Sequence, residues 1–134
     1  MKITSKLITG FRSEIDNGRG HKIISDVPES NGGHDLGPTS LELTSMGLGG
    51  CITSIFTMLA KKMRLTIKNI EAELEIEKLK TSPTITSVFI LVKVKSDEPL
   101  ELIEKCLNLT MKTCPVGILF EDAGIPIEYD LITL

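Results

Sequence analysis

Residues 37–51 read GPTSLELTSMGLGGC and open the longest helix that the sequence predicts. Thr39, followed three residues later by Glu42, matches a capping box, in which the two side chains accept backbone N–H groups of the first turn. Leucine, isoleucine and methionine then recur at helical spacing as far as about Met63. We therefore expect one helix over residues 39–63, apolar around most of its circumference and covered on several sides.

Three glycines interrupt this helix just before Cys51, and each costs about 1 kcal/mol relative to alanine. Gly49 is one of them; the other two belong to one narrow helical face made of Gly47, Gly50, Cys51 and Ser54. A face of small residues lets another backbone approach closely or leaves room for a bound molecule. Two interpretations follow. Either the helix packs tightly against its neighbours around an unreactive thiol, or the small residues leave space around a reactive thiol.

The rest of the chain predicts strands and two shorter helices around the long one. The strand over residues 70–79 alternates apolar residues with glutamates, which is typical of a strand with one solvated face. In chain order we expect a hairpin of residues 3–16 and 21–27, joined at Asn17-Gly18, then a loop over residues 28–38 and the long helix. An antiparallel strand pair (70–79 and 84–95) follows, then a helix opened by Pro99, a short helix from Pro115 to about residue 123, and a strand over residues 125–134. The fold class is α+β, with antiparallel sheets packed on a long central helix in a single domain over residues 1–134.

Composition excludes several functions. The 134 residues carry 15 Lys and Arg against 18 Asp and Glu, with no Trp and one Tyr, so nucleic-acid binding is not expected. We see no signal peptide and no run of about 18 apolar residues, and therefore expect a cytoplasmic protein that does not span a membrane. His21 and His34 lack ligand spacing to the cysteines, so we expect no metal.

The three cysteines occupy different settings. Cys106 shares a helical stripe with Leu102 and Leu109, which predicts a core residue. Cys114 precedes Pro115 and so occupies the expected N-cap of the short helix. Unsatisfied N–H groups at a helix N-terminus favour a thiolate, so we expect the pKa of Cys114 to be lowered.

Taken together, these features resemble the OsmC/Ohr family of organic hydroperoxide reductases and their relatives. The resemblance covers essentially the whole chain: a loop ending in Gly-Pro-Thr, a helix reading LEL…GLGGC, two long antiparallel strands, and KTCPVG near the C-terminus. It implies an OsmC-like intertwined homodimer with active sites between subunits, and thiol chemistry without metal or flavin cofactors. Cys51 is similar to the family's peroxidatic cysteine, which becomes a sulfenic acid, and Cys114 resembles the resolving cysteine, which closes a disulfide. A dithiol such as a lipoylated protein then reduces both.

Two positions depart from the family pattern. The proven reductases carry a glutamate just after a G-T-N-P element, paired with an arginine that activates the thiolate, and in register with Cys51 that position is Leu41. Glu42 comes one residue later and points nearly opposite to Cys51 on an ideal helix, so we interpret it as the cap. The family's arginine comes from the N-terminal hairpin, where Arg19 is the best match and Arg12 the second. The chain is thus closer to the uncharacterised branch of the family.

The leading hypothesis is a cytoplasmic thiol peroxidase for organic hydroperoxides, acting in the oxidative stress response. Cys51 attacks the peroxide, Cys114 resolves the product, and Arg19 assists. The resemblance sets this order, although the helix dipole favours Cys114 as the more acidic thiol. A second hypothesis is a dimeric protein that binds a small apolar molecule in the same interface pocket with idle thiols. A third is a redox-regulated structural dimer without turnover.

Overall fold

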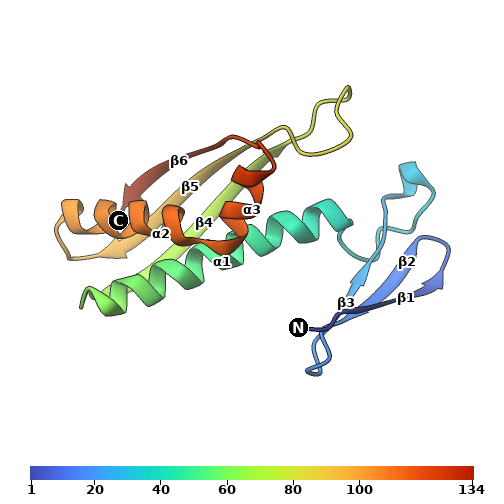
Figure 1. Ribbon diagram of the computed structural model, residues 1–134, viewed down its shortest axis with the longest axis horizontal. Coiled ribbons are helices and arrows are strands. Elements are labelled where there is room, and N and C mark those ends of the chain that lie inside the picture. The colour runs from blue at the N-terminus through green and yellow to red at the C-terminus, as the bar shows by residue number, and fades with distance from the viewer. The chain divides into compact units, whose positions relative to one another are not determined.

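The computed structural model describes residues 1–134, which form two compact units, Met1–Thr44 and Ser45–Leu134. Each unit contains one three-stranded sheet, and the chain as a whole has a mixed α+β fold with three helices (Figure 1). The elements are β1 (Thr4–Thr9), β2 (Arg12–Asp16), β3 (Lys22–Ser25), the 3-10 turn η1 (Glu29–Asn31), α1 (Ser40–Lys62), β4 (Ile67–Glu77), β5 (Ser87–Ser96), α2 (Leu100–Thr113), α3 (Pro115–Asp122) and β6 (Ile127–Thr133). The single domain over residues 1–134 stays a prediction.

The N-terminal unit is an antiparallel sheet in the order β1-β2-β3. A single strand over residues 3–16 is wrong, because the chain turns at Gly10, whose φ of +55° is readily adopted only by glycine. The turn at Asn17-Gly18 is confirmed: Gly18 has a φ of +72°, and the side-chain oxygen of Asn17 accepts the backbone N–H of Arg19 at 2.9 Å. The first hairpin therefore becomes a three-stranded meander.

The loop over residues 28–38 is confirmed, apart from the short turn η1. Two of its glycines allow the backbone to pass very close to the end of the sheet. A Cβ at Gly33 would lie 1.9 Å from the carbonyl oxygen of Val27, and one at Gly37 would lie 2.2 Å from that of Ile24. Since no side chain fits at either position, the glycines are required by packing.

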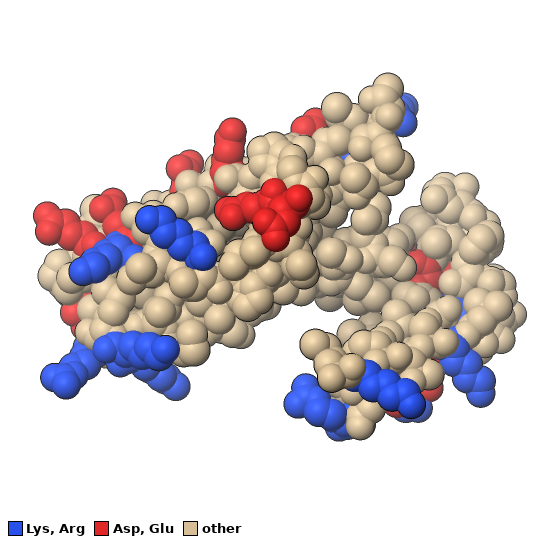
Figure 2. Space-filling view, in the orientation of Figure 1, with Lys and Arg blue, Asp and Glu red and all other residues tan.

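The capping box at the start of α1 is confirmed. The N–H of Thr39 donates to Oε2 of Glu42 at 2.6 Å, and the N–H of Glu42 donates to the hydroxyl oxygen of Thr39 at 3.3 Å. The helix then runs from Ser40 to Lys62, within one residue of the predicted range at each end. Figure 2 shows Lys and Arg side chains gathered at its C-terminal end, as expected from the partial negative charge there.

In the C-terminal unit, α1 buries one stripe of side chains: Leu48, Ile52, Phe56 and Ala60. Its other sides are open in this chain, since Met46 and Met58 are 61% and 42% exposed. The expectation that α1 is covered on several sides is therefore wrong for the single chain. By length and composition α1 could also cross a membrane, although the core helix of a protein outside the membrane passes the same test. The expectation that the chain does not span a membrane therefore stays a prediction.

The second sheet has the order β4-β5-β6, and its inner face completes this core with Val88, Ile90, Val92 and Val94 of β5. Strands β4 and β5 are antiparallel as predicted, and the glutamates of β4 point to the exposed side, where Glu71 and Glu73 pair with Lys93. Antiparallel pairing throughout is wrong, because β6 runs parallel to β5. Helices α2 and α3 separate these two strands in the chain, and such a crossover returns the chain in the same direction.

Candidate functional site

Cys51 lies midway along α1, half-buried, and packs against the core of the C-terminal unit. The small-residue face beside it is open: a Cβ at Gly47 or Gly50 would meet no atom within 4 Å. Gly49 differs, since a Cβ there would lie 3.3 Å from Cδ1 of Leu74 on β4. The three glycines therefore divide into two that leave space beside the thiol and one that allows close packing of helix on sheet.

Cys114 occupies the N-cap of α3, as predicted, and its Sγ accepts the backbone N–H of Gly117 at 3.4 Å. The side chain is completely buried. The pKa of Cys114 is raised to about 11, chiefly by burial and then by the neighbouring Cys51 thiol, while the N–H of Gly117 acts in the opposite direction. The expected lowering of this pKa is wrong, because loss of water around the thiolate outweighs the helix N-terminus.

The fold brings the two thiols into the same core, since Cys51 packs against the cluster of buried side chains that includes Cys114. The first turn of α3 lies against α1 at the same level: a Cβ at Gly117 would be 3.9 Å from Cδ1 of Leu48, one helical turn before Cys51. Because Cys114 is fully buried and Cys51 is partly exposed, Cys51 is the thiol that a reagent can reach.

Gly117 is a site residue that sequence reasoning missed. It supplies the backbone N–H that donates to the sulfur of Cys114. The signal was available in the tetrapeptide Cys-Pro-Val-Gly, because the third residue after an N-cap is the usual donor to its side chain.

Cys106 is a core residue, as predicted, and is completely buried. Its thiol donates to the carbonyl oxygen of Phe56 at 3.7 Å, and burial raises its pKa. The predicted stripe is wrong in its other members, since Leu102 and Leu109 are 38% and 37% exposed. The buried face of α2 is formed by Ile103, Cys106, Leu107, Thr110 and Met111.

The two candidate arginines belong to the N-terminal unit. Arg19 lies in the exposed turn after β2, and its place beside the thiols stays a prediction. Arg12 begins β2, and its Nε lies 3.6 Å from Oδ2 of Asp26. This Nε is buried without a hydrogen-bond partner, so the ionic contact with Asp26 offsets the cost of removing it from water. Arg12 is thus held by the buried carboxylate of Asp26, whereas Arg19 is exposed on the turn between β2 and β3.

Asp26 was not singled out from the sequence, yet it organises the loop that follows β3. It is 2% exposed, and its carboxylate accepts the backbone N–H groups of Val27 at 2.9 Å and of His34 and Leu36 at 3.3 Å. Burial disfavours the charge, but these N–H groups and Arg12 together outweigh it and lower the pKa of Asp26. An aspartate directly before a loop rich in proline and glycine was the available signal.

The first turn of α1 offers no carboxylate in the register of Cys51. Leu41 occupies that position and is 38% exposed. The carboxylate of Glu42 is engaged in the cap, where the hydrogen bonds of Thr39 lower the pKa of Glu42. Glu42 is therefore a structural residue, as the capping-box interpretation predicts.

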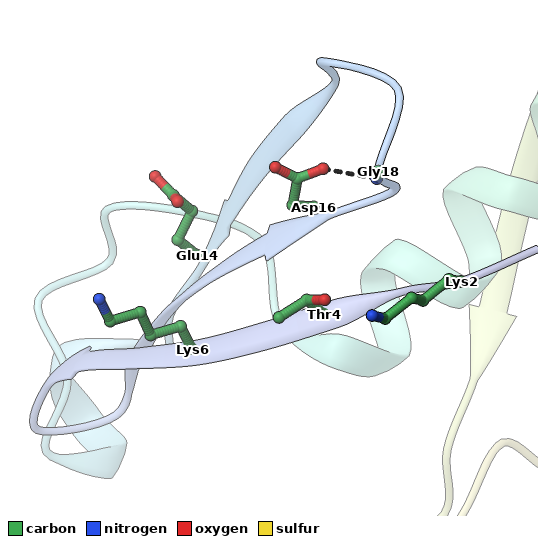
Figure 3. Close-up of a pocket in the computed structure, with 6 residues that line it drawn as sticks. All are labelled: Lys2, Thr4, Lys6, Glu14, Asp16 and Gly18. Carbon is green, nitrogen blue, oxygen red and sulfur yellow. Dashed lines mark hydrogen bonds between the residues drawn. The ribbon is translucent and has the colours of Figure 1, made fainter.

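A shallow hollow of about 300 Å³ lies on the sheet of the N-terminal unit, lined by Lys2, Thr4, Lys6, Glu14, Asp16 and Gly18 (Figure 3). Its acidic groups already have partners: Glu14 pairs with Lys22, and Asp16 accepts the N–H of Gly18. It contains no nucleophilic thiol or histidine. No group of three or more His, Cys, Asp or Glu side chains lies close enough together anywhere in the chain to hold a metal ion.

The chain matches one model of a protein family. The family model described as OsmC-like protein matches residues 32–130, which include both Cys51 and Cys114. A search of curated proteins found no match.

Solved structures share the fold at low sequence identity. An OsmC-like protein from Mycoplasma pneumoniae is 14% identical with a TM-score of 0.88, over 99% of this chain and 96% of that one. An organic hydroperoxide resistance protein OsmC from Legionella pneumophila is 12% identical with a TM-score of 0.73, over 98% and 96% of the two chains. The organic hydroperoxide resistance protein OhrB of Bacillus subtilis is 17% identical with a TM-score of 0.67, over the same shares.

Proposed function

Because the chain belongs to the OsmC-like family, we propose that it is a thiol-dependent peroxidase that reduces organic hydroperoxides through Cys51 and Cys114. One observation carries this proposal: two cysteines far apart in sequence belong to the same core, where Cys51 is half-buried beside an open face and Cys114 is completely buried. Two structures with the same fold are named organic hydroperoxide resistance proteins, which supports this class of substrate.

The proposed reaction needs no cofactor. The Cys51 thiolate attacks the terminal oxygen of the hydroperoxide, the O–O bond breaks, and Cys51 becomes a sulfenic acid. The alkoxide that leaves takes up the proton released when Cys51 ionised and departs as the alcohol. The sulfur of Cys114 then attacks the sulfenic sulfur; a disulfide forms, and the hydroxyl leaves with the Cys114 proton as water. A dithiol such as a lipoylated protein reduces this disulfide through a mixed disulfide and is itself oxidised.

The working form in this proposal is a cytoplasmic homodimer. Each unit by itself leaves large apolar side chains uncovered: Leu7 and Phe11 in the N-terminal unit are 64% and 59% exposed, and Met46 on α1 is 61% exposed. Apolar surface of this kind marks an interaction face. Arg19, with Arg12 as the alternative, is proposed as the cation that assists Cys51, and neither nucleic acid nor membrane is a proposed partner.

A second candidate function is a dimeric protein that binds a small apolar molecule beside idle thiols. Leu41 in the register of the family's glutamate supports it, as does the open face formed by Gly47 and Gly50. An apolar ligand that co-purifies with the protein, together with thiols that stay reduced under mild oxidation, would favour this function. A redox-regulated dimer without turnover would form the disulfide but consume no excess peroxide.

The deciding experiment follows consumption of cumene hydroperoxide in the presence of a dithiol. Wild type is compared with Cys51→Ser, Cys114→Ser and the matched control Cys106→Ser, whose thiol is buried in the core. We expect loss of turnover in the first two variants and retention in the third. Peptide mass mapping after one equivalent of peroxide should show a disulfide between Cys51 and Cys114. Equal consumption by wild type and Cys51→Ser would exclude the peroxidase.

A further inference from the structure

We propose that the outer face of the β4-β5-β6 sheet is a docking surface for a cationic amphipathic helix of a partner protein. Two apolar residues of the central strand form its middle, and carboxylates of both neighbouring strands flank them. The face includes neither Cys51 nor Cys114, so the inference does not depend on the proposed function. We call it the acid-flanked face, and its residues are Phe89 and Leu91 of β5, Glu73 and Glu75 of β4, and Glu128 and Asp130 of β6.

The apolar middle of this face points away from the core. Side chains alternate along β5, and Val88, Ile90 and Val92 are buried on the inner side. Phe89 and Leu91 are half-buried on the other side, and neither belongs to the core nor packs against it. All three helices contribute buried side chains to the core. No helix of the C-terminal unit therefore covers the outer face.

Phe89 lies between two exposed carboxylates, because Glu75 and Glu128 are its register partners on β4 and β6. Neither carboxylate forms an ion pair within the chain. Both charges are thus available to cations of another molecule, on either side of one aromatic ring.

Leu91 repeats this arrangement at the next outward position of β5, between Glu73 and Asp130. Lys93 pairs with Glu73, so the acidic character of the face ends there, whereas Asp130 forms no ion pair. Because neighbouring strands lie about 4.8 Å apart, the two rows of carboxylates are about 10 Å from each other. The face is therefore a narrow apolar strip with negative charge along both sides.

The width of the strip selects a helix as the occupant. The backbone of β5 is paired on both sides, so a partner cannot add a strand there and must contact the side chains. An α-helix is about 10–12 Å across with its side chains, which matches the distance between the two acidic rows. Its apolar stripe can lie on Phe89 and Leu91 while Lys or Arg on each side of the stripe reaches a row of carboxylates.

The charge of the strip disfavours other occupants. Nucleic acids and anionic membrane surfaces carry the same sign of charge as the two acidic rows. A second copy docked by the same face would oppose like charges, because a two-fold contact places a patch against itself. A cationic protein segment is the occupant that matches both the apolar middle and its flanks.

The test measures binding of a fluorescent helical peptide of about 14 residues, about 21 Å long, whose leucine stripe has lysines on both sides. Fluorescence anisotropy with the full chain should show binding that weakens as salt rises from about 0.05 to about 0.5 M. The double variant Glu75→Gln/Glu128→Gln should weaken binding about fivefold, and Phe89→Thr about tenfold. The matched control Glu101→Gln/Glu104→Gln, on the exposed side of α2, should stay within about twofold of wild type. Absence of binding, or equal weakening by both double variants, would overturn the inference.

A second peptide separates docking from general charge attraction. It has the same composition, but its leucines and lysines are mixed around the helix, and it should bind at least about fivefold more weakly. Equal binding of the two peptides would overturn the inference.

Two further measurements locate the contact and identify the occupant. A photoreactive group in the leucine stripe should crosslink to β4, β5 or β6 of the wild-type chain; crosslinks confined to other elements would overturn the inference even if Phe89→Thr failed to fold. Sedimentation of the free chain should give the same oligomeric state for wild type and Glu75→Gln/Glu128→Gln. A change of state would assign the face to a second copy and overturn the partner helix.

Discussion

The backbone N–H of Gly117 and the Sγ of Cys114 are 3.4 Å apart and form a hydrogen bond within the first turn of α3. A Cβ at Gly117 would lie 3.6 Å from that sulfur and 3.4 Å from the Cβ of Cys114, which is ordinary van der Waals contact. The amide, rather than the missing side chain, is therefore the feature of Gly117 that matters for the thiol pair.

Gly117→Ala and Gly117→Pro should separate these two properties. Alanine keeps the N–H and should leave the pKa of Cys114 nearly unchanged, whereas proline removes the donor and should raise that pKa further. Proline is tolerated in the first turn of a helix, where the N–H has no partner within the helix. The pKa is measured by thiolate absorbance near 240 nm in the Cys51→Ser background. Equal values for both variants would show that the amide does not act on the sulfur.

The raised pKa of Cys114 predicts how stability depends on pH. The unfolded thiol has a pKa of about 9 and the folded one of about 11, so the folded chain holds a proton that the unfolded chain releases between these values. This contribution is fully present below pH 9 and is lost as pH rises toward 11. Urea unfolding at pH 8, 9, 10 and 11 should show a steeper decline in wild type than in Cys114→Ser. Parallel declines would contradict the burial of this thiol.

Substitutions in the capping box should lower the stability of the protein without changing the reactivity of Cys51. Thr39→Ala removes the acceptor for the N–H of Glu42 and should lower the free energy of unfolding by about 1 kcal/mol. Glu42→Gln keeps the amide oxygen as acceptor for Thr39 and should cost less. Neither change should alter Cys51 alkylation at pH 7. A large drop in alkylation for Glu42→Gln would restore Glu42 as a candidate activating group.

The division among the three glycines predicts that alanine has different effects at Gly50 and Gly49 of α1. Gly50→Ala meets open space in the chain and should stabilise the helix by up to about 1 kcal/mol. Gly49→Ala places a Cβ 3.3 Å from Leu74, so the gain in helix propensity should be offset by strain. Thermal unfolding of both variants checks the stabilities. If the open face serves the substrate, Gly50→Ala should also slow the oxidation of Cys51 by cumene hydroperoxide, while Gly49→Ala should not.

The lowered pKa of Asp26 predicts that the protein loses stability when it is acidified. The folded carboxylate holds its charge at a pH where the unfolded one is protonated, so the contribution is present above about pH 4 and is lost as pH falls through the folded pKa. Asp26→Asn should therefore be less stable than wild type at pH 7 and lose less on acidification. Asp130→Asn, on the exposed side of β6, is the matched control and should follow wild type.

Local signals in the sequence predicted most of the elements. The capping box and the apolar spacing located α1 to within a residue at each end, and the alternating glutamates identified β4. The errors came from features without a local signal. Parallel pairing of β6 with β5 depends on where the chain returns after two helices, and the turn at Gly10 interrupts a segment that reads as a continuous strand.

The sequence by itself determined where the two candidate thiols lie: Cys51 stands among small residues of a long helix, and Cys114 is the N-cap of a short one. It did not determine the direction in which the pKa of Cys114 is shifted. The helix N-terminus favours a thiolate at Cys114, and only the tertiary structure showed that complete burial outweighs this and raises the pKa to about 11. The physical reason is that capping is encoded by neighbours in the chain, whereas desolvation depends on α1, α3 and the sheet packing together.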